Sequence, residues 1–379
     1  MPRIDNFLRL MQERGASDLH FVVGQPPCFR LSGSIEPIRY KSLSAVDFEM
    51  FLGEVTPKHI WEHYKGCGDA DYAYECPGVA RFRVNLFTQE RGLGAVFRII
   101  PTKLLTMEQL GLPESCQKLV ALERGLCLVT GPTGSGKSTT LSAIINKMNE
   151  TRRLHIITIE DPIEFVHPHK QSLITQREVG ASAISFASGL RAALREDPDI
   201  VLVGEMRDLE TISLALAAAE TGLLVFGTLH TNSAAKTVDR VINVFPTDEQ
   251  DSVRGIIAGT LSCVLAQQLL KRKKGGRVAA LEIMFGNPAM GNIIREGKTH
   301  QLTNMIRAGK RQGMVTMDDS LERLVKEDVI TPEAAYEKCI DKKEFKKRML
   351  TLGHQVGASD DDPEEMEKML NEVLGVGKS

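Results

Sequence analysis

The stretch "GPTGSGKST" at residues 131–139 constrains the fold more than any other. It follows the apolar run "LCLVT" and precedes a helix-compatible sequence that begins near Ser138. Glycines at 131, 134 and 136 let the backbone curl so that its N–H groups point inward at a phosphate, and the helix that follows adds a partial positive charge. A chance match in a glycine-rich loop is the alternative, and the strand–loop–helix context argues against it.

This loop predicts ATP and Mg²⁺ as cofactors. Lys137 is suited to neutralise the β/γ-phosphate oxygens, and the Ser138 hydroxyl is suited to ligate Mg²⁺. The expected nucleotide-binding residues are Pro132, Thr133, Gly134, Ser135, Gly136, Lys137, Ser138 and Thr139.

Strands alternate with helices from residue 126 to residue 230, which predicts an α/β domain with a mostly parallel sheet. The first 100 residues read as a small α+β domain, with an antiparallel hairpin formed by "ARFRVNLFTQ" and "GAVFRII". Apolar residues at 4, 7, 8 and 11 predict an amphipathic helix that stops at Gly15. After residue 247 we expect largely helix, apart from the strand-like "AALEIMF".

The predicted boundaries follow from composition. We expect an N-terminal domain at 1–100, a linker with two prolines at 101–113, an ATPase domain at 114–355 and an acidic tail at 356–379.

Three carboxylates follow the apolar strand in "ITIEDPIEF", namely Glu160, Asp161 and Glu164. Ligands bind beyond the carboxyl ends of the strands in open α/β sheets, so these acids are expected to face the phosphates. Carboxylates near an anionic nucleotide suit a metal ion or a water that must lose a proton. An inert, solvated strand edge is the alternative.

The next strand, in "DIVLVGEMRD", ends in Gly204 and Glu205 rather than in the aspartate that usually holds magnesium. Either the site does not hydrolyse nucleotide, or the metal and the attacking water are managed by acids placed elsewhere. Together, the motifs favour Ser138, Glu205 and Asp161 as metal ligands. Glu205 then holds the metal shell or polarises the water, and Glu164, with Glu160 beside it, is the alternative general base.

Two further sets of side chains are candidates for catalysis. His230 ends another buried strand in "GTLHTNSA", where it either donates to the γ-phosphate or is satisfied by a neighbouring carboxylate. Arg81 and Arg83 share one face of their strand, and Arg98 lies in the adjacent strand. They are either arginine fingers that reach the nucleotide from a separate domain, or a solvated strand face.

Composition argues against several classes of protein without excluding a nucleic-acid motor. Forty-seven basic against 49 acidic residues give a net charge of −2 and no general electrostatic reason to bind nucleic acid. The basic runs "KRKKGGR" (271–277) and "DKKEFKKR" (341–348) are expected to be solvated helix ends or docking patches. Seven scattered cysteines without a C-x-x-C pair favour reduced thiols in the cytoplasm and no structural zinc. No apolar run is long enough for membrane insertion.

These blocks, in this order, resemble the type II/IV secretion-system ATPase superfamily. The matching blocks are 131–139, 159–164, 199–208 and 227–231, with "GASDLHFVVGQPPCFRLSG" near the N-terminus. In that superfamily a glutamate replaces the missing aspartate, and Glu205 is the corresponding residue. Within it the chain looks most like the PilT-type pilus retraction ATPases. The pilus-assembly and type II secretion ATPases of the superfamily usually carry a tetracysteine zinc motif after the block at 227–231, whereas this chain has only Cys263 and Cys339 there. The stretch "NPAMGNIIREGKTHQL" also resembles a retraction-specific element, with Gly291 where that pattern has arginine.

The resemblance implies a PAS-like N-terminal domain, a RecA-like ATPase domain and a homohexamer that powers pilus retraction by nucleotide-driven domain rotation. It implies a cytoplasmic motor associated peripherally with the inner-membrane pilus machinery. The expected partners are copies of itself, the pilus platform protein and a paralogous motor ATPase, with no nucleic acid. An accessory paralogue, a pilus-assembly or secretion ATPase, a nucleic-acid motor and a non-hydrolysing scaffold are the alternatives.

Overall fold

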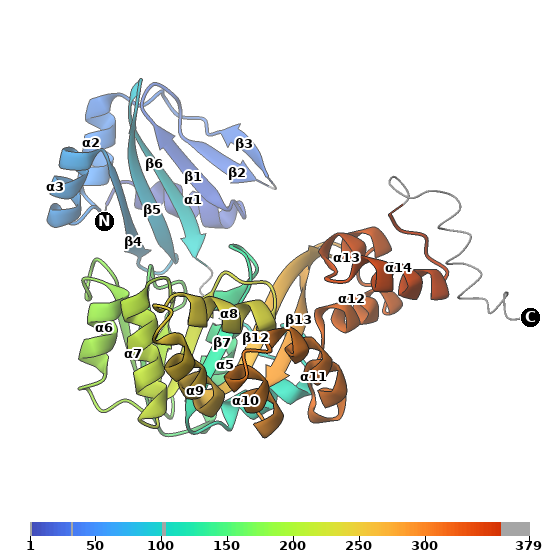
Figure 1. Cartoon of the computed structure of the whole chain (residues 1–379). Helices are drawn as coiled ribbons and strands as arrows, with labels where there is room; N and C mark the ends of the chain where they lie inside the picture. Colours follow the sequence, from blue (N-terminus) through green and yellow to red (C-terminus); the bar gives the residue numbers. More distant parts are fainter. Residues whose placement is uncertain (1, 32, 101–103, 358–379) are drawn as a thin grey trace, which may run out of the picture. The chain divides into compact units, whose positions relative to one another are not determined.

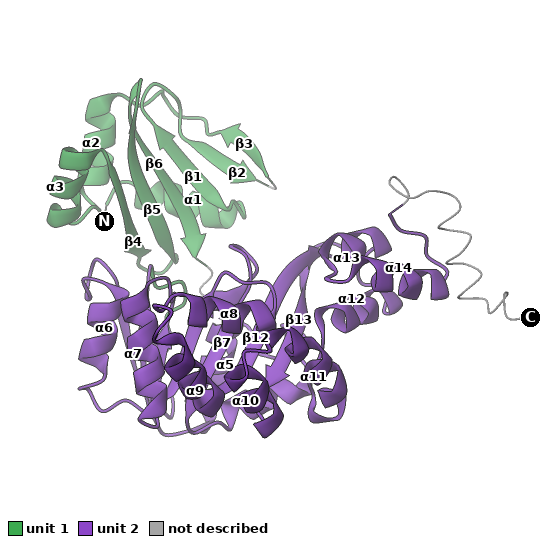
Figure 2. Ribbon diagram, viewed as in Figure 1, with its two compact units in different colours: residues 1–104, 162–166 green, residues 105–161, 167–379 purple. Residues whose placement is uncertain are grey.

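The computed structural model describes residues 2–31, 33–100 and 104–357. These residues form two compact units, one of 1–104 with 162–166 and one of 105–161 with 167–379 (Figure 2). Residues 105–113, expected as part of the linker, belong to the second unit, where Met107 is buried. The expected acidic tail lies outside the described residues from position 358 onward. None of the described helices is long and apolar enough to cross a membrane.

The first unit is a six-stranded sheet with the order β3-β2-β1-β6-β5-β4, in which neighbouring strands are antiparallel (Figure 1). Its elements are α1 (Asp5–Glu13), β1 (Asp18–Val22), β2 (Cys28–Leu31), β3 (Ser34–Pro37), α2 (Ala45–Gly53), α3 (Lys58–Cys67), β4 (Asp69–Cys76), β5 (Ala80–Gln89) and β6 (Gly92–Ile100). The predicted β5–β6 hairpin is confirmed, as is the amphipathic helix, whose Leu8 and Met11 are buried. Gly15, with φ +67°, follows that helix.

The second unit holds a seven-stranded sheet with the order β13-β12-β7-β11-β10-β8-β9. Its strands are β7 (Gly125–Thr130), β8 (His155–Glu160), β9 (Leu173–Glu178), β10 (Ile200–Val203), β11 (Leu224–Leu229), β12 (Leu261–Lys271) and β13 (Arg277–Phe285). Its helices are α4 (Gln117–Val120), α5 (Lys137–Thr151), α6 (Phe186–Ala193), α7 (Leu209–Glu220), α8 (Ala234–Asn243), α9 (Gln250–Thr260), α10 (Pro288–Arg295), α11 (Leu302–Ala308), α12 (Met317–Lys326), α13 (Pro332–Lys338) and α14 (Lys342–Thr351).

All neighbouring strands of this sheet are parallel except the β12–β13 pair. Every residue of β7, β10 and β11 is buried, as expected for parallel strands covered by helices on both faces. Successive residues of β7 belong to opposite faces: Leu126 and Leu128 pack with residues of α7 and α8, whereas Cys127 and Val129 pack with residues of α5. The predicted α/β class is therefore confirmed.

The expectation of largely helical structure after residue 247 is wrong at β12. A run of apolar residues such as "LSCVLA" fits a buried helix or a buried strand equally well. Here the run pairs with β7 on one side and β13 on the other, and this tertiary pairing decides its conformation. The basic run 271–277 consequently forms the β12–β13 turn rather than a helix end, with Gly275 and Gly276 at positive φ.

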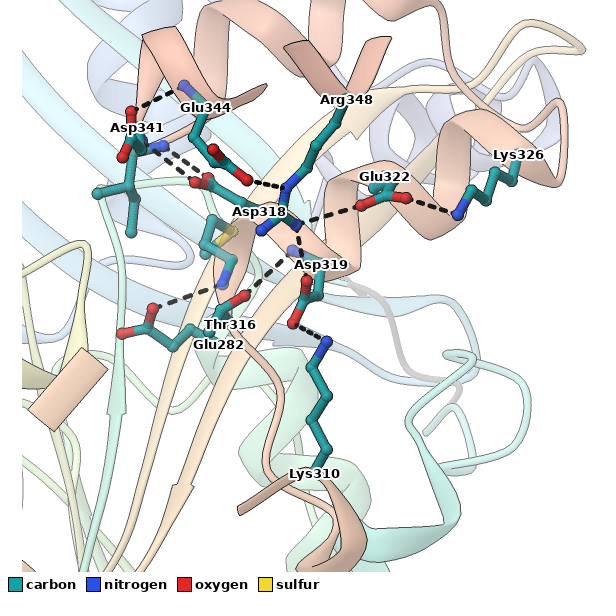
Figure 3. A network of polar contacts seen from close by, with 12 residues as sticks. Glu282, Lys310, Thr316, Asp318, Asp319, Glu322, Lys326, Asp341, Glu344 and Arg348 are labelled. Carbon is teal, nitrogen blue, oxygen red and sulfur yellow. Dashed lines mark hydrogen bonds and ion pairs between the residues drawn. The ribbon is translucent and has the colours of Figure 1, made fainter. Parts of the chain in front are cut away.

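The second basic run lies on α14, and it is only partly solvated. Lys346 is 3% exposed, and Arg348 lies in a polar network that joins α14 to α12 (Figure 3). Arg348 Nη1 donates to Asp319 Oδ1 at 2.8 Å and to Glu322 Oε2 at 3.2 Å. Lys310 Nζ contacts the other Asp319 oxygen at 2.9 Å. The expectation of a solvated helix end is therefore wrong at Arg348, whose guanidinium group binds carboxylates of its own unit.

We expect Arg348→Met to lower the melting temperature of the protein, because two largely buried carboxylates lose a shared cation. We expect the free energy of unfolding to fall by about 1–3 kcal/mol, and each kcal/mol lowers the melting temperature by about 2–4 °C. Burial raises the pKa of Asp319, but hydrogen bonds from Lys310 and Arg348 bring it below its usual value. The Asp319 contribution is thus present above about pH 4 and lost as the pH falls through the folded-state pKa.

Calorimetry from pH 3 to pH 8 checks this, with Lys343→Met as the control because Lys343 is exposed on the same helix. Equal melting temperatures for both variants at neutral pH contradict a structural role for the network.

Candidate functional site

Four neighbouring strands, β7, β11, β10 and β8, end at one edge of the sheet. They are parallel and in register, with Val203 of β10 opposite Gly227 on one side and opposite Ile159 on the other. The residues that follow them are the glycine-rich loop, His230, Glu205 and Asp161, respectively. The structure thereby brings the predicted motifs of the second unit to adjacent strand ends.

The glycine-rich loop connects β7 to α5, as predicted. Gly134 and Gly136 have φ of +77° and +88°, a conformation that favours glycine. No side chain caps the N-terminus of α5, so its first N–H groups are open to an anion. Lys137 Nζ donates to the carbonyl oxygens of Gly131 at 2.9 Å and Pro132 at 3.2 Å, and its ammonium group thus lies along the loop.

Gly204 explains why the residue immediately after β10 is not an acid. Its N–H donates to the Ile159 carbonyl at 2.7 Å, and a Cβ on residue 204 would lie 3.0 Å from that same oxygen and 3.2 Å from Glu160 Cα. Contacts this close leave little room for a side chain. The carboxylate therefore stands one residue later, at Glu205.

Glu205 is held through a single carboxylate oxygen. His230 Nε2 lies 2.7 Å from Oε1, and Arg207 Nε donates to the same atom. Burial raises the pKa of Glu205, but the bonds from Arg207 and His230 outweigh it and hold the pKa below its usual value. Oε2 accepts no hydrogen bond from a described residue. Glu205 is thus a fixed carboxylate with one oxygen available to a ligand.

His230 contacts this neighbouring carboxylate, which is the second of the two environments expected for it. Its side chain is still 43% exposed. Arg207 was not among the residues selected from the sequence, although it lies two positions after Glu205. Its pKa is raised by Glu205 and also by the charge of Asp161. Arg207 therefore lies within the electrostatic reach of both acids.

Of the remaining acids, Glu160 is engaged within the sheet and Asp161 is exposed. Glu160 Oε1 accepts hydrogen bonds from Thr158 Oγ1 at 2.6 Å and from Gln176 Nε2 at 3.1 Å. Glu164 is exposed in the segment 162–166, which belongs to the first unit.

The three arginines also belong to the first unit. Arg83 and Arg98 are directly opposite each other on β5 and β6, as expected for one shared face. Arg83 Nε donates to Asp71 Oδ2 at 3.0 Å, and Arg98 Nε donates to Asp18 Oδ1 at 2.7 Å. Arg81 lies opposite Glu75 in the β4–β5 register. Both paired arginines keep about half or more of their side chains exposed, at 48% and 69%.

Gln267 was also missed from the sequence, because it lies on the strand that we expected to be helical. Its side-chain amide contacts the glycine-rich loop and the first turns of α5. The sequence points to Gln267 only if β12 is assigned as a strand that pairs with β7.

Comparisons with known proteins identify the relatives of this chain. A family model described as type II/IV secretion system protein matches residues 3–338. The chain is 51% identical over 335 residues to the type IV pilus retraction ATPase PilT of Pseudomonas aeruginosa, which covers 88% of this chain and 97% of that protein. It is 52% identical over 310 residues to a twitching motility protein of Neisseria gonorrhoeae, which covers 82% and 83% of the two chains.

A crystal structure of the pilus retraction motor PilT with bound ADP is similar to this chain, with a TM-score of 0.85 and 43% identity over 90% of this chain and 98% of that one. Because the family model spans residues 3–338 and the Pseudomonas aeruginosa relative matches over 97% of its length, the chain belongs to the type II/IV secretion system protein family.

Proposed function

We propose that this chain is an ATPase that powers type IV pilus retraction. The observation that carries the proposal is the 51% identity that extends over 97% of the length of a pilus retraction ATPase. The open glycine-rich loop beside the fixed carboxylate of Glu205 supports it chemically. In this view the first unit is PAS-like, the second is RecA-like, and the protein acts as a homohexamer in the cytoplasm at the inner-membrane pilus machinery.

The residues of the second unit fit a nucleotide with Mg²⁺. Protein sites for Mg²⁺ commonly supply one or two carboxylates or a hydroxyl and leave the other positions to phosphates and water. Ser138 offers the hydroxyl, and Oε2 of Glu205 and the exposed Asp161 offer carboxylate oxygens. Among the described residues, no group of three or more His, Cys, Asp or Glu side chains could hold a metal ion by itself. When bound, Mg²⁺ neutralises phosphate charge that develops during transfer.

The chain's own residues then divide the work. Lys137 exchanges its two carbonyl contacts for the β/γ-phosphates, and the uncapped N–H groups of α5 bind phosphate oxygens. Glu205 stays ionised, because Arg207 lowers its pKa. A carboxylate with a low pKa is a weak base, so Glu205 is better suited to the metal shell and to orienting water than to taking the proton. Glu164 is the alternative general base.

The arginines of the first unit act as fingers if their domain closes on a nucleotide. The exposed pair of Arg83 with Asp71 is worth little in water, so exchange of that carboxylate for phosphate costs little. Asp18, the partner of Arg98, is buried with 3% of its side chain exposed, so release of Arg98 costs more. Differential affinity of open and closed states for ATP and ADP drives the domain rotation. The partners in this proposal are further copies of the chain, the platform protein and a paralogous motor.

A nucleic-acid motor is disfavoured by where the two basic runs lie. Lys273 in the β12–β13 turn pairs with Asp328, and Arg348 on α14 is surrounded by three carboxylates. If the protein bound single-stranded DNA in a salt-dependent manner and the DNA stimulated hydrolysis, a nucleic-acid motor would be favoured instead. A hexamer that binds ATP and releases no phosphate supports a non-hydrolysing scaffold.

We expect Glu205→Gln to slow ATP turnover by about a hundredfold or more and to leave ADP affinity intact. If Glu205 holds the metal shell, this variant also needs a higher Mg²⁺ concentration for half-maximal rate. Glu164→Gln, measured in the same phosphate-release assay, keeps the wild-type Mg²⁺ requirement if Glu164 is the base. Wild-type turnover in both variants contradicts both assignments.

We expect Arg207→Met to shift the acid limb of kcat/KM to higher pH. Arg207 lowers the pKa of Glu205, so without this cation Glu205 takes up a proton at a higher pH. Arg207→Lys keeps the charge and is the control, with an acid limb between those of the wild type and the methionine variant. Coincident acid limbs in all three proteins contradict the role of Arg207.

We expect deletion of the gene to increase the number of surface pili and to abolish surface motility. The wild-type gene restores motility, whereas a Lys137→Ala gene does not, because the phosphate contact is lost. Fluorescence imaging of labelled pili measures retraction directly. Partial loss of retraction identifies an accessory paralogue, and unchanged retraction rejects the proposed function.

A further inference from the structure

Gln267 on β12 is almost fully buried, with 2% of the residue exposed, and both ends of its side-chain amide are used. Its Nε2 donates to the Ser135 carbonyl oxygen at 2.6 Å, and its Oε1 accepts from Thr140 Oγ1 at 2.8 Å. The first contact fixes the glycine-rich loop, and the second fixes α5 one turn into the helix. A single side chain thus ties both parts of the phosphate-binding element to the sheet.

The bond to Ser135 also sets the direction of the next N–H group. In a trans peptide the C=O and the N–H of one unit point in opposite directions. With the Ser135 carbonyl turned toward Gln267, the Gly136 N–H is turned away from it. This N–H has no acceptor among the described residues. An N–H without an acceptor at a helix start is a donor ready for an anion.

The glycine-rich loop packs closely against both the side chain and the backbone of Gln267. A Cβ on Gly136 would lie 2.9 Å from Gln267 Nε2, and a Cβ on Gly131 would lie 2.2 Å from the Gln267 backbone oxygen. The Ser135 hydroxyl oxygen is buried and has no hydrogen-bond partner in the described chain. Among the described residues, the Ser135 hydroxyl thus adds no hydrogen bond that could fix the loop in place of the bond from Gln267 Nε2 to the Ser135 carbonyl.

We propose that Gln267 is a positioning residue that pre-organises the loop at 131–136 for the phosphates of the nucleotide. This rests on the proposed ATPase function of the same site. Without the two hydrogen bonds the loop must be ordered when the nucleotide binds, and that cost weakens binding. The cost falls on the substrate and on the transition state alike, so KM rises while kcat changes little.

The test is the binding of a fluorescent ADP analogue to the full chain. Gln267→Met keeps the length of the side chain and removes both hydrogen bonds, and we expect its Kd to be about tenfold or more above that of the wild type. The KM for ATP rises in parallel, and kcat stays within about threefold. Gln267→Glu keeps an acceptor for Thr140 but faces the Ser135 carbonyl with an oxygen, and it binds as weakly as the methionine variant.

Gln268→Met is the matched control. Gln268 is the next residue of β12 and points to the other face, where its Nε2 makes only a 3.5 Å contact with the Lys338 carbonyl. Its Kd stays within about twofold of the wild type. Thr140→Val removes one of the two hydrogen bonds of Gln267, and we expect a smaller rise in the Kd for the ADP analogue. This variant tests the proposal if the Gln267 variants do not fold.

A folded Gln267→Met protein with wild-type Kd overturns the inference, whatever its melting temperature. A fall in melting temperature alone marks Gln267 as merely structural and likewise overturns it. Failure of the wild type itself to bind ADP rejects the proposed function instead. The two failures are therefore distinguishable.

Discussion

The parallel, in-register alignment of β7, β11, β10 and β8 is the constraint on which the site depends. Because these strands run in one direction, their carboxyl ends lie at one edge, and the four segments that follow them meet there. Each strand is short and buried, so its register is fixed by apolar contacts on both faces. The side chains that follow these four strands are therefore positioned by this core, although they are far apart in the sequence.

The close approach of β10 to β8 then decides which residue carries the charge. Gly204 donates to Ile159 at 2.7 Å, and this contact leaves no comfortable space for a side chain. Moving the acid to residue 205 places it beside His230 at the end of β11 and near Arg207. A missing aspartate is thus a consequence of strand packing and does not indicate a dead site.

Much of the sheet edge could be predicted from the sequence, because apolar strands and the residues after them are local patterns. The glycine-rich loop, Glu205 and His230 lie where their motifs indicated. The contacts were harder to predict, since the pairing of His230 with Glu205 depends on the order of strands in the sheet. Gln267 escaped notice because "LSCVLA" has no period that separates helix from strand, and only its pairing with β7 resolves it.

The β12–β13 hairpin has a larger role than its position beside the motifs suggests. On one face Gln267 holds the glycine-rich loop. On the other face the buried carboxylate of Glu282 accepts the Ala234 N–H, at the start of α8 just after the His230 segment, at 2.7 Å, and the Met317 N–H of α12 at 3.4 Å. Burial raises the pKa of Glu282, so these N–H groups and the two helix starts offset part of the cost of its charge. Two buried polar side chains on opposite faces of one hairpin therefore hold the glycine-rich loop, the start of α8 and the start of α12.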